Sequence, residues 1–154
     1  MAFHITQFVA VTLLFLFSGV FWGSWLSIGR SFDEFPLIEY VHIAQIINRN
    51  LGVSMRVISI PCIILMVLCA WLIPQKTFAE FLLFACSILF AISALVITVF
   101  VEVSMNNKII TWTTESAPLD WQNIRKRWQF YNDIRTLVSG LSFLIFTAIT
   151  LKLF

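Results

Sequence analysis

The chain has 154 residues, of which 60% are hydrophobic and 12% are charged, and its formal net charge is +2. A soluble domain is about half apolar and about a quarter charged, so this composition excludes an ordinary water-soluble domain. The sequence has no basic patch interleaved with aromatic residues, and we expect no nucleic-acid partner. The main partner we expect is the lipid bilayer.

Four long apolar runs are the predicted elements. A helix needs about 20 residues to cross the hydrocarbon core, and in lipid it must satisfy its backbone hydrogen bonds internally. The last uncharged run, 136–151, is short, so its helix should begin earlier, near Asp120. The predicted fold class is all-α, an integral membrane four-helix bundle with up-down-up-down topology in one membrane domain over residues 1–154. The spans are expected at about 5–29, 57–75, 81–101 and 132–153.

In the first span, Gly19 and Gly23 have the G-x-x-x-G spacing that lets another helix approach closely. That helix is either a second copy of the chain, which gives a homodimer, or a neighbour within the bundle. We favour the neighbour, because three partner helices are already available. The N-terminus lacks the basic start and cleavage site of a signal peptide, so this helix should remain in the mature protein.

The second predicted helix begins well before its span. Pro36 suits the first turn of a helix. We expect the helix to continue into the span with a break near Gly52 and a bend at Pro61, because glycine and proline weaken a helix interior. Asp120 is the expected N-cap of the fourth helix. Helices 2 and 4 should therefore extend beyond the bilayer.

His42 and Gln45 share one face of the second predicted helix. Glu39 and His42 also form E-x-x-H, the ligand spacing of di-iron helix bundles. Such a site needs a second motif, and the other histidine, His4, is expected at the opposite end of the bundle. We therefore expect no dinuclear metal site and no other cofactor, with a single metal ion left as an alternative. His42 is interpreted as a hydrogen-bonded residue or as a base.

Basic residues are divided unequally between the two sides of the predicted bundle. By the positive-inside rule, the richer side faces the cytoplasm. The longer connections and the extensions of helices 2 and 4 are therefore expected to be cytoplasmic, with both termini outside. The cytoplasmic side would carry Arg30, Arg49, Arg56, Lys108, Arg125, Lys126, Arg127 and Arg135, against Lys76 and Lys152 on the other side.

At the end of the third span, Glu102 is the expected ion-pair partner of Arg135, because a half-buried guanidinium is costly without a carboxylate. Asn106 lies one helical turn further on and should line the same wall. Two interpretations stay open. The charges form either a structural belt of ion pairs or a ligand site.

The last predicted helix carries polar and aromatic side chains on one face. At 100° per residue these positions fall within an arc of about 80°. Such a stripe should face the bundle rather than the acyl chains, so it predicts a polar pocket at the cytoplasmic end. Its members are Trp121, Arg125, Trp128, Asn132 and Arg135.

Three sequence patterns accompany the four spans: Asn106-Asn107 followed by Trp112, the stretch Pro118-Leu-Asp-Trp121, and the run Arg125-Lys-Arg-Trp128-Gln-Phe-Tyr-Asn132-Asp-Ile-Arg135-Thr136. The stretch His42-Ile-Ala-Gln45-Ile-Ile-Asn48-Arg49 is a looser match. Together they resemble a family of bacterial four-span membrane proteins, classified as a domain of unknown function, that includes anthrone oxygenase-like proteins. The resemblance implies a location in the bacterial inner membrane.

The few members of that family with a known activity are similar to enzymes that oxidise anthrone rings to quinones with O₂ and no cofactor. The resemblance therefore implies an oxidoreductase acting on a hydrophobic aromatic or quinone-like ligand. This chemistry requires a base, groups that hold an enolate and a dry pocket. The resemblance implies anion binding by Arg125, Asn132 and Arg135, stacking by Trp128, and His42 or Glu102 as the base. Asn106 and Gln45 are further ligand-binding candidates because of their places on the predicted helices.

The competing hypothesis is a non-catalytic membrane accessory or assembly subunit, in which the polar belt only holds the helices together. A transporter is less favoured, because the sequence has no inverted repeat and no charge deep within a span.

Overall fold

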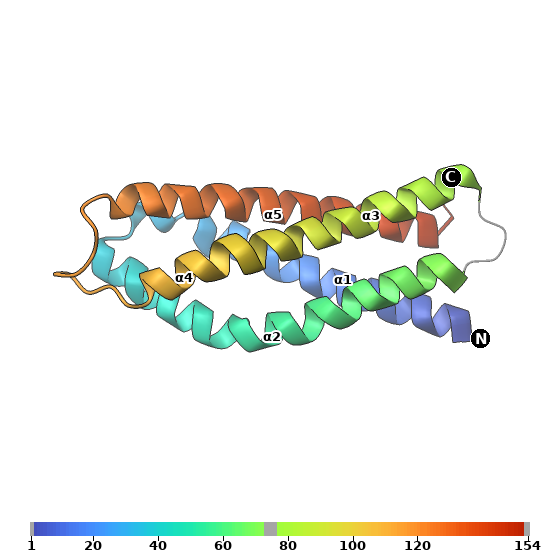
Figure 1. The fold of residues 1–154 in the computed structure, drawn as a ribbon, viewed down its shortest axis with the longest axis horizontal. Helices are drawn as coiled ribbons and strands as arrows, with labels where there is room; N and C mark the ends of the chain where they lie inside the picture. The colour runs from blue at the N-terminus through green and yellow to red at the C-terminus, as the bar shows by residue number, and fades with distance from the viewer. Residues whose placement is uncertain (1, 73–76, 153–154) are drawn as a thin grey trace.

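The structure, a computed structural model, describes residues 2–72 and 77–152, and within them the chain is helical with no strand. Four rods run side by side along the long axis (Figure 1), and each contains a helix long and apolar enough to cross a membrane. The predicted all-α membrane bundle is therefore confirmed. In chain order the elements are α1 (Ala2–Ser24), η1 (Trp25–Gly29), η2 (Phe32–Glu34), α2 (Leu37–Leu72), α3 (Phe78–Val96), η3 (Ile97–Glu102), α4 (Val103–Ile109) and α5 (Trp121–Thr150).

Two short π-helical segments interrupt the regular helices. The segment η1 continues α1, and η3 joins α3 to α4, so the third rod runs without a break from 78 to 109. A π-helical turn inserts extra backbone into a helix and is frequently found at functional sites. Both insertions lie toward the loop end of the bundle.

The four rods alternate in direction. The start of α1, the end of α2, the start of α3 and the end of α5 lie at one end of the molecule (Figure 1). The connections 30–36 and 110–120 lie at the other end. The up-down-up-down topology predicted from the sequence is thus confirmed.

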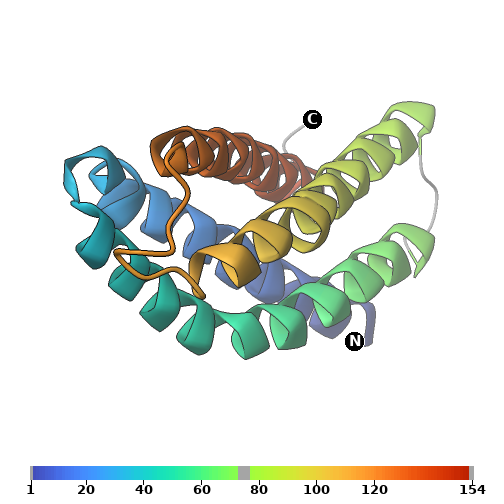
Figure 2. The same cartoon turned by 60° about the vertical axis from the view of Figure 1, so that its left-hand side comes forward.

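Each rod has two main neighbours. α5 contacts α1 and α3, α1 also contacts α2, and α2 meets the third rod less extensively (Figure 2). Ser87 of α3 and Ser142 of α5 each donate a hydrogen bond to the other's backbone carbonyl, at 2.9 and 2.8 Å. Small residues that exchange hydrogen bonds are a common means of joining helices in lipid, where the hydrophobic effect between them is absent.

α2 passes through Gly52 and Pro61 as one helix, so the predicted break is wrong. A glycine costs a helix only about 1 kcal/mol, and in membrane helices the hydrogen bond lost at proline is tolerated. The apolar stretch of α2 begins at Ser54, so its first turns extend past the candidate span, as expected. Residues 73–75 and 153, which we had assigned to spans, lie outside the described residues.

The helix starts differ in how they are capped. Thr77 precedes α3, and its hydroxyl accepts from the backbone N–H of Glu80 while the Glu80 carboxylate accepts from the Thr77 N–H. This reciprocal arrangement satisfies two of the free donors of a helix start. Asp120 occupies the predicted N-cap position before α5, but its side chain makes no capping hydrogen bond.

Gly19 and Gly23 face open space. A Cβ atom built on either glycine would meet no heavy atom within 4 Å outside its own helix backbone. The close approach within the bundle is instead at Gly140 of α5, where a Cβ would lie 2.7 Å from the indole nitrogen of Trp22. Our interpretation that Gly19 and Gly23 pack against a neighbour in the same bundle is therefore wrong.

The interior has two apolar clusters. One lies toward the termini and includes Phe17, Met66, Phe84 and Phe146. The other lies at the loop end and consists mainly of aromatic residues. Glu102 of the third rod and Asn132, Arg135 and Thr136 of α5 form a buried polar layer that falls between the two clusters in sequence. This polar layer is where the candidate site is found.

Candidate functional site

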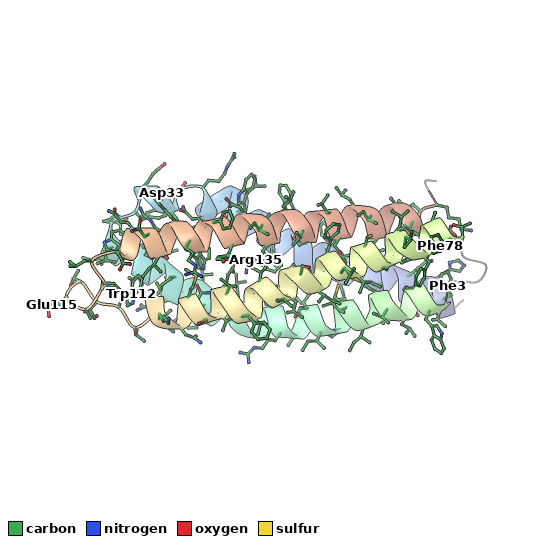
Figure 3. All side chains as sticks on the ribbon, turned by 45° about the horizontal axis from the view of Figure 1, so that its top comes forward. Phe3, Asp33, Phe78, Trp112, Glu115 and Arg135 are labelled. Carbon is green, nitrogen blue, oxygen red and sulfur yellow. The ribbon has the colours of Figure 1, made fainter. Side chains whose placement is uncertain are left out.

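The centre of the polar layer is an ion pair between Arg135 of α5 and Glu102 at the end of η3. The Arg135 Nη1 atom contacts the Glu102 Oε2 atom, and the residues are only 7% and 2% exposed. Figure 3 places Arg135 between the helices, further from the loop end than Trp112. This contact confirms the predicted pairing of Glu102 with Arg135. Both residues belong to helices that can cross a membrane.

Three other side chains surround Arg135. Its Nη2 atom donates to Asn132 Oδ1 at 2.7 Å, and Nη1 lies 3.4 Å from Thr98 Oγ1. The guanidinium carbon also lies 4.2 Å from the ring centroid of Phe21 on α1. A ring face stabilises a cation that has little water around it. The planar group is thus fixed by contacts from three rods.

The cluster retains unused hydrogen-bonding capacity. Among the described residues, Glu102 Oε1, Arg135 Nε and Asn132 Nδ2 are buried and have no partner. Buried polar atoms are nearly always paired, and each unpaired one costs about 1–3 kcal/mol. One free acceptor and two free donors therefore lie on three side chains that are linked through Arg135.

Both π-helical segments end beside this cluster. The segment η3 ends at Glu102 itself. The segment η1 ends at Gly29, where a Cβ atom would lie 3.3 Å from Asn132 Nδ2, so a larger residue would press on the amide. The two insertions therefore direct Glu102 into the bundle and bring the α1 backbone close to Asn132.

Arg125 lies on the same face of α5 as Arg135 but makes different contacts. Its Nη1 and Nη2 atoms donate to the carbonyls of Phe35 and Asp33 at 2.9 and 3.2 Å, and the Asp33 carboxylate lies at 3.4 Å. The guanidinium also faces the rings of Tyr40 and Trp121. Burial raises the pKa of the Tyr40 phenol well above its usual range, against the opposing effect of the Arg125 charge, so this ring stays neutral. Arg125 holds the 32–35 segment against α5.

The structure brings Trp128 and Asn106 together. The Trp128 indole N–H donates to Asn106 Oδ1 at 2.9 Å. The Trp128 ring also contacts Phe32, with centroids 5.1 Å apart. Phe32 and Trp128 both belong to the aromatic cluster at the loop end, so Trp128 forms the boundary of the polar layer on that side.

His42 and Gln45 lie in a separate hollow. This hollow has a volume of about 260 Å³ and is formed by the start of α2 and by Trp112, Thr113 and Thr114. Gln45 Nε2 donates to the Ile110 carbonyl at 3.0 Å. Both α2 residues are solvent-exposed, and neither has a hydrogen bond or ion pair to the Glu102 cluster. The structure therefore splits the predicted site residues into two groups.

Comparison with known sequences identifies the family. Residues 50–145, more than half of the chain, match the sequence profile described as anthrone oxygenase. The chain belongs to the anthrone oxygenase family. No curated protein and no solved structure matches it.

The part of the chain that matches the anthrone oxygenase family contains the whole Glu102, Asn132 and Arg135 cluster. His42 and Gln45 lie before the matched residues. In the described parts of the chain, no group of three or more histidine, cysteine or carboxylate side chains is placed to hold a metal ion.

Sequence reasoning missed three members of this cluster. Thr98 precedes Glu102 by four residues, so helical spacing alone could have placed it on the same face. Phe21 and Gly29 come from α1 and contact Arg135 and Asn132 across the bundle. No spacing within the sequence marks either of them, because their contacts depend on how the rods pack.

Proposed function

We propose that this protein is a membrane oxygenase that converts a hydrophobic anthrone-type ketone into the corresponding quinone, with O₂ as co-substrate. The observation that carries the proposal is the set of unpaired atoms in the buried cluster, Glu102 Oε1, Arg135 Nε and Asn132 Nδ2. The family match supports the reaction type. Ionisable residues buried among membrane-spanning helices are costly and are usually functional.

The three atoms fit the first step of the reaction. Glu102 Oε1 takes a proton from the CH₂ carbon of the ring ketone, and the enolate oxygen accepts hydrogen bonds from Arg135 Nε and Asn132 Nδ2. The ring carbon then transfers electrons to O₂ and forms a C–O bond. Loss of the second hydrogen and cleavage of the O–O bond give the quinone carbonyl and one water. Anthrone and O₂ thus yield anthraquinone and H₂O, with every atom balanced.

Charge is conserved within the cluster during the proton transfer. Before the step, the Arg135 guanidinium is paired with the Glu102 carboxylate. After the step, Glu102 is neutral and the enolate is the anion beside Arg135. No net charge appears in a region of low dielectric constant, where an unpaired charge costs several kcal/mol. An ion pair with free acceptor and donor atoms is therefore suited to this chemistry.

The other sequence candidates take different roles in this proposal. Arg125 is occupied by backbone carbonyls, so we assign it to holding the 32–35 segment rather than to the anion. Trp128 and Asn106 form the wall of the site. His42, with Gln45 in the same hollow, is the alternative base.

The test is oxidation of anthrone by the purified protein in lipid nanodiscs. O₂ uptake and anthraquinone absorbance are followed, with empty nanodiscs as the control for spontaneous oxidation. Glu102→Gln keeps the shape of the side chain but removes the base, and it should lower the rate about 10²–10⁴-fold. His42→Gln is the matched variant in the other hollow and should retain the wild-type rate.

Two results would contradict the proposal. If Glu102→Gln folds normally and oxidises anthrone at the wild-type rate, the cluster does not supply the base, and a loss in His42→Gln would move the site to the other hollow. If the folded wild-type protein does not accelerate the oxidation of anthrone or of ring-hydroxylated anthrones, the competing role as an accessory or assembly subunit is supported instead.

We further propose that the protein lies in the bacterial inner membrane with the 30–36 and 110–120 connections in the cytoplasm and both termini outside. The support is the positive-inside rule. Arg125 and Arg135 are buried, but the other basic residues at the loop end are exposed and still outnumber Lys76 and Lys152. Reporter fusions to the C-terminus, active only outside the cytoplasm, test this orientation.

A homodimer through α1 is an alternative proposal for the exposed face of this helix. Gly19 and Gly23 face open space and have the spacing that lets two helices meet closely. Native mass spectrometry from mild detergent tests for the dimer, and replacing either glycine by leucine should dissociate it.

A further inference from the structure

A groove runs along the outer surface of the bundle between α1 and α5. It has a volume of about 330 Å³ and is lined by Phe15, Ser18, Gly19, Trp22, Leu137, Gly140, Leu141, Phe143 and Leu144. Both helices are candidate membrane spans, and most of these side chains are exposed or half-buried. The groove therefore faces the acyl chains, and its volume lies within the range of about 300–1,000 Å³ for small-molecule sites.

The walls of the groove suit a flat ring. Phe15 and Phe143 contact one another at 5.9 Å between centroids, and Trp22 provides a third aromatic surface. Gly19 has open space where a Cβ atom would lie, so no side chain fills the groove there. Aromatic faces beside a bare stretch of helix allow a planar molecule to lie close to the backbone.

Trp22 contributes an unused hydrogen-bond donor. Its indole nitrogen lies over Gly140, 2.7 Å from the place a Cβ would occupy, and its N–H has no acceptor in the part of the chain that the structure describes. Trp22 is 39% exposed, at a position inside the candidate span, where the surrounding acyl chains offer no acceptor. Tryptophan N–H groups usually find a partner when removed from water. An oxygen atom of a ligand in the groove would satisfy it.

The groove shares the α1–α5 interface with the ion pair. At its floor, the hydroxyl of Ser18 donates to the hydroxyl of Ser139 at 3.4 Å, and Ser139 lies one turn from Arg135 on the same face of α5. Phe21, next to Trp22 in α1, is the ring that contacts Arg135. Side chains of the α1–α5 interface, among them Ser18, Ser139 and Phe21, therefore lie between a molecule in the groove and the proposed catalytic cluster.

We propose that this groove binds a planar fused-ring aromatic ketone or quinone from the bilayer, whose carbonyl oxygen accepts a hydrogen bond from Trp22. The choice of this ligand class rests on the proposed function, because the substrate and product of that reaction are such molecules. The groove thus acts as the membrane-side binding site for the substrate before it reaches Glu102.

Two other occupants fit the groove less well. An acyl chain has no oxygen atom to offer Trp22 at this depth. A second copy of α1 joined through Gly19 and Gly23 would use both glycines, whereas Gly19 lines the groove and Gly23 does not. This difference between the two glycines makes the proposal testable.

The test measures binding of 9,10-anthraquinone to the protein in nanodiscs by native mass spectrometry. Gly19→Leu places a side chain in the groove and should weaken binding at least about tenfold, as expected for a filled site. Gly23→Leu is the matched control, since it has the same open surroundings on the same helix, and it should bind normally. Equal binding by Gly19→Leu and wild type would overturn the proposal. Loss in both variants together with loss of a dimer would assign the face to a second copy.

A second comparison tests the hydrogen bond. Trp22→Phe keeps an aromatic ring and removes the donor, so it should weaken anthraquinone binding about three- to tenfold and leave binding of anthracene, which lacks the oxygens, unchanged. Trp25→Phe is the control outside the groove. Equal weakening for both probes would overturn the assigned contact.

The binding assay also separates this proposal from the proposed function. Glu102→Gln should bind anthraquinone normally even though it is expected to lose turnover. If turnover is absent in the wild type but Gly19 still controls binding, the groove stands and the oxygenase proposal fails. If turnover is present but Gly19→Leu changes neither binding nor the KM for anthrone, the groove fails and the oxygenase proposal stands.

Discussion

Arg125 and Arg135 lie on the same face of α5, ten residues apart, and both are buried. Arg125 donates to two backbone carbonyls, and its acidic partner Asp33 is 60% exposed. Arg135 instead meets the buried carboxylate of Glu102, the amide of Asn132 and the ring of Phe21. The same residue type on the same stripe therefore has a solvated partner in one place and a fully buried one in the other.

The difference shows what a buried guanidinium can do at two depths. Near the loop end, carbonyls of an irregular segment are available, and an arginine that binds them fixes the path of the chain. Between membrane-spanning helices, the backbone carbonyls already accept hydrogen bonds within their own helices, and Arg135 is paired with side chains instead. An ion pair formed in this way can change its protonation state, whereas a contact with carbonyls cannot.

The largest effect is expected from breaking the buried pair. Arg135→Ala leaves the Glu102 carboxylate without its partner and should lower the free energy of unfolding by about 3–5 kcal/mol. The double variant Glu102→Leu with Arg135→Met should recover most of that stability, because apolar residues of similar size can replace a buried pair. Thermal unfolding in mild detergent, followed by circular dichroism, measures both. A double variant as unstable as the single one would argue against a strongly coupled pair.

A smaller effect is expected at the loop end. Arg125→Lys cannot reproduce the two-pronged contact with the Phe35 and Asp33 carbonyls, so stability should fall by about 1.5–3 kcal/mol. Anthrone oxidation per folded molecule should not change, in contrast to Arg135→Lys, which should lose most of it. The ratio of rate to folded fraction is the measurement. An equal loss of turnover in both variants would erase the functional distinction between the two arginines.

The smallest loss of stability is expected at the hydrogen bond between Trp128 and Asn106, which lies between the surroundings of Arg125 and those of Arg135. Asn106→Leu removes the acceptor of the Trp128 indole N–H and should cost about 1–3 kcal/mol, because a buried donor is left unpaired. Adding Trp128→Phe removes that donor and should restore part of the loss. The two unfolding free energies are compared in the same detergent. No recovery in the double variant would mean that the hydrogen bond is not the reason Asn106 matters.

Much of the bundle follows from the sequence because its solvent is lipid. Long uncharged runs must form helices there, short connections make neighbours antiparallel, and these two constraints leave little freedom. The pairing of Glu102 with Arg135 was also predictable, since each stands at the edge of an uncharged run and a buried charge needs a partner. The contact of Trp128 with Asn106 agrees with the predicted shared wall.

The contacts between rods were decided only by the tertiary structure. Residue spacing placed Arg125 and Arg135 on one face, but Arg125 binds the backbone carbonyls of a loop, a contact that spacing within α5 cannot reveal. In the same way, the G-x-x-x-G motif indicated a close approach at Gly19 and Gly23, whereas the close approach is at Gly140, against Trp22. The sequence determined which segments cross the membrane and which residues are costly to bury. The relative rotation and depth of the helices decided which of those residues meet, because side-chain contacts form across the bundle and not along the chain.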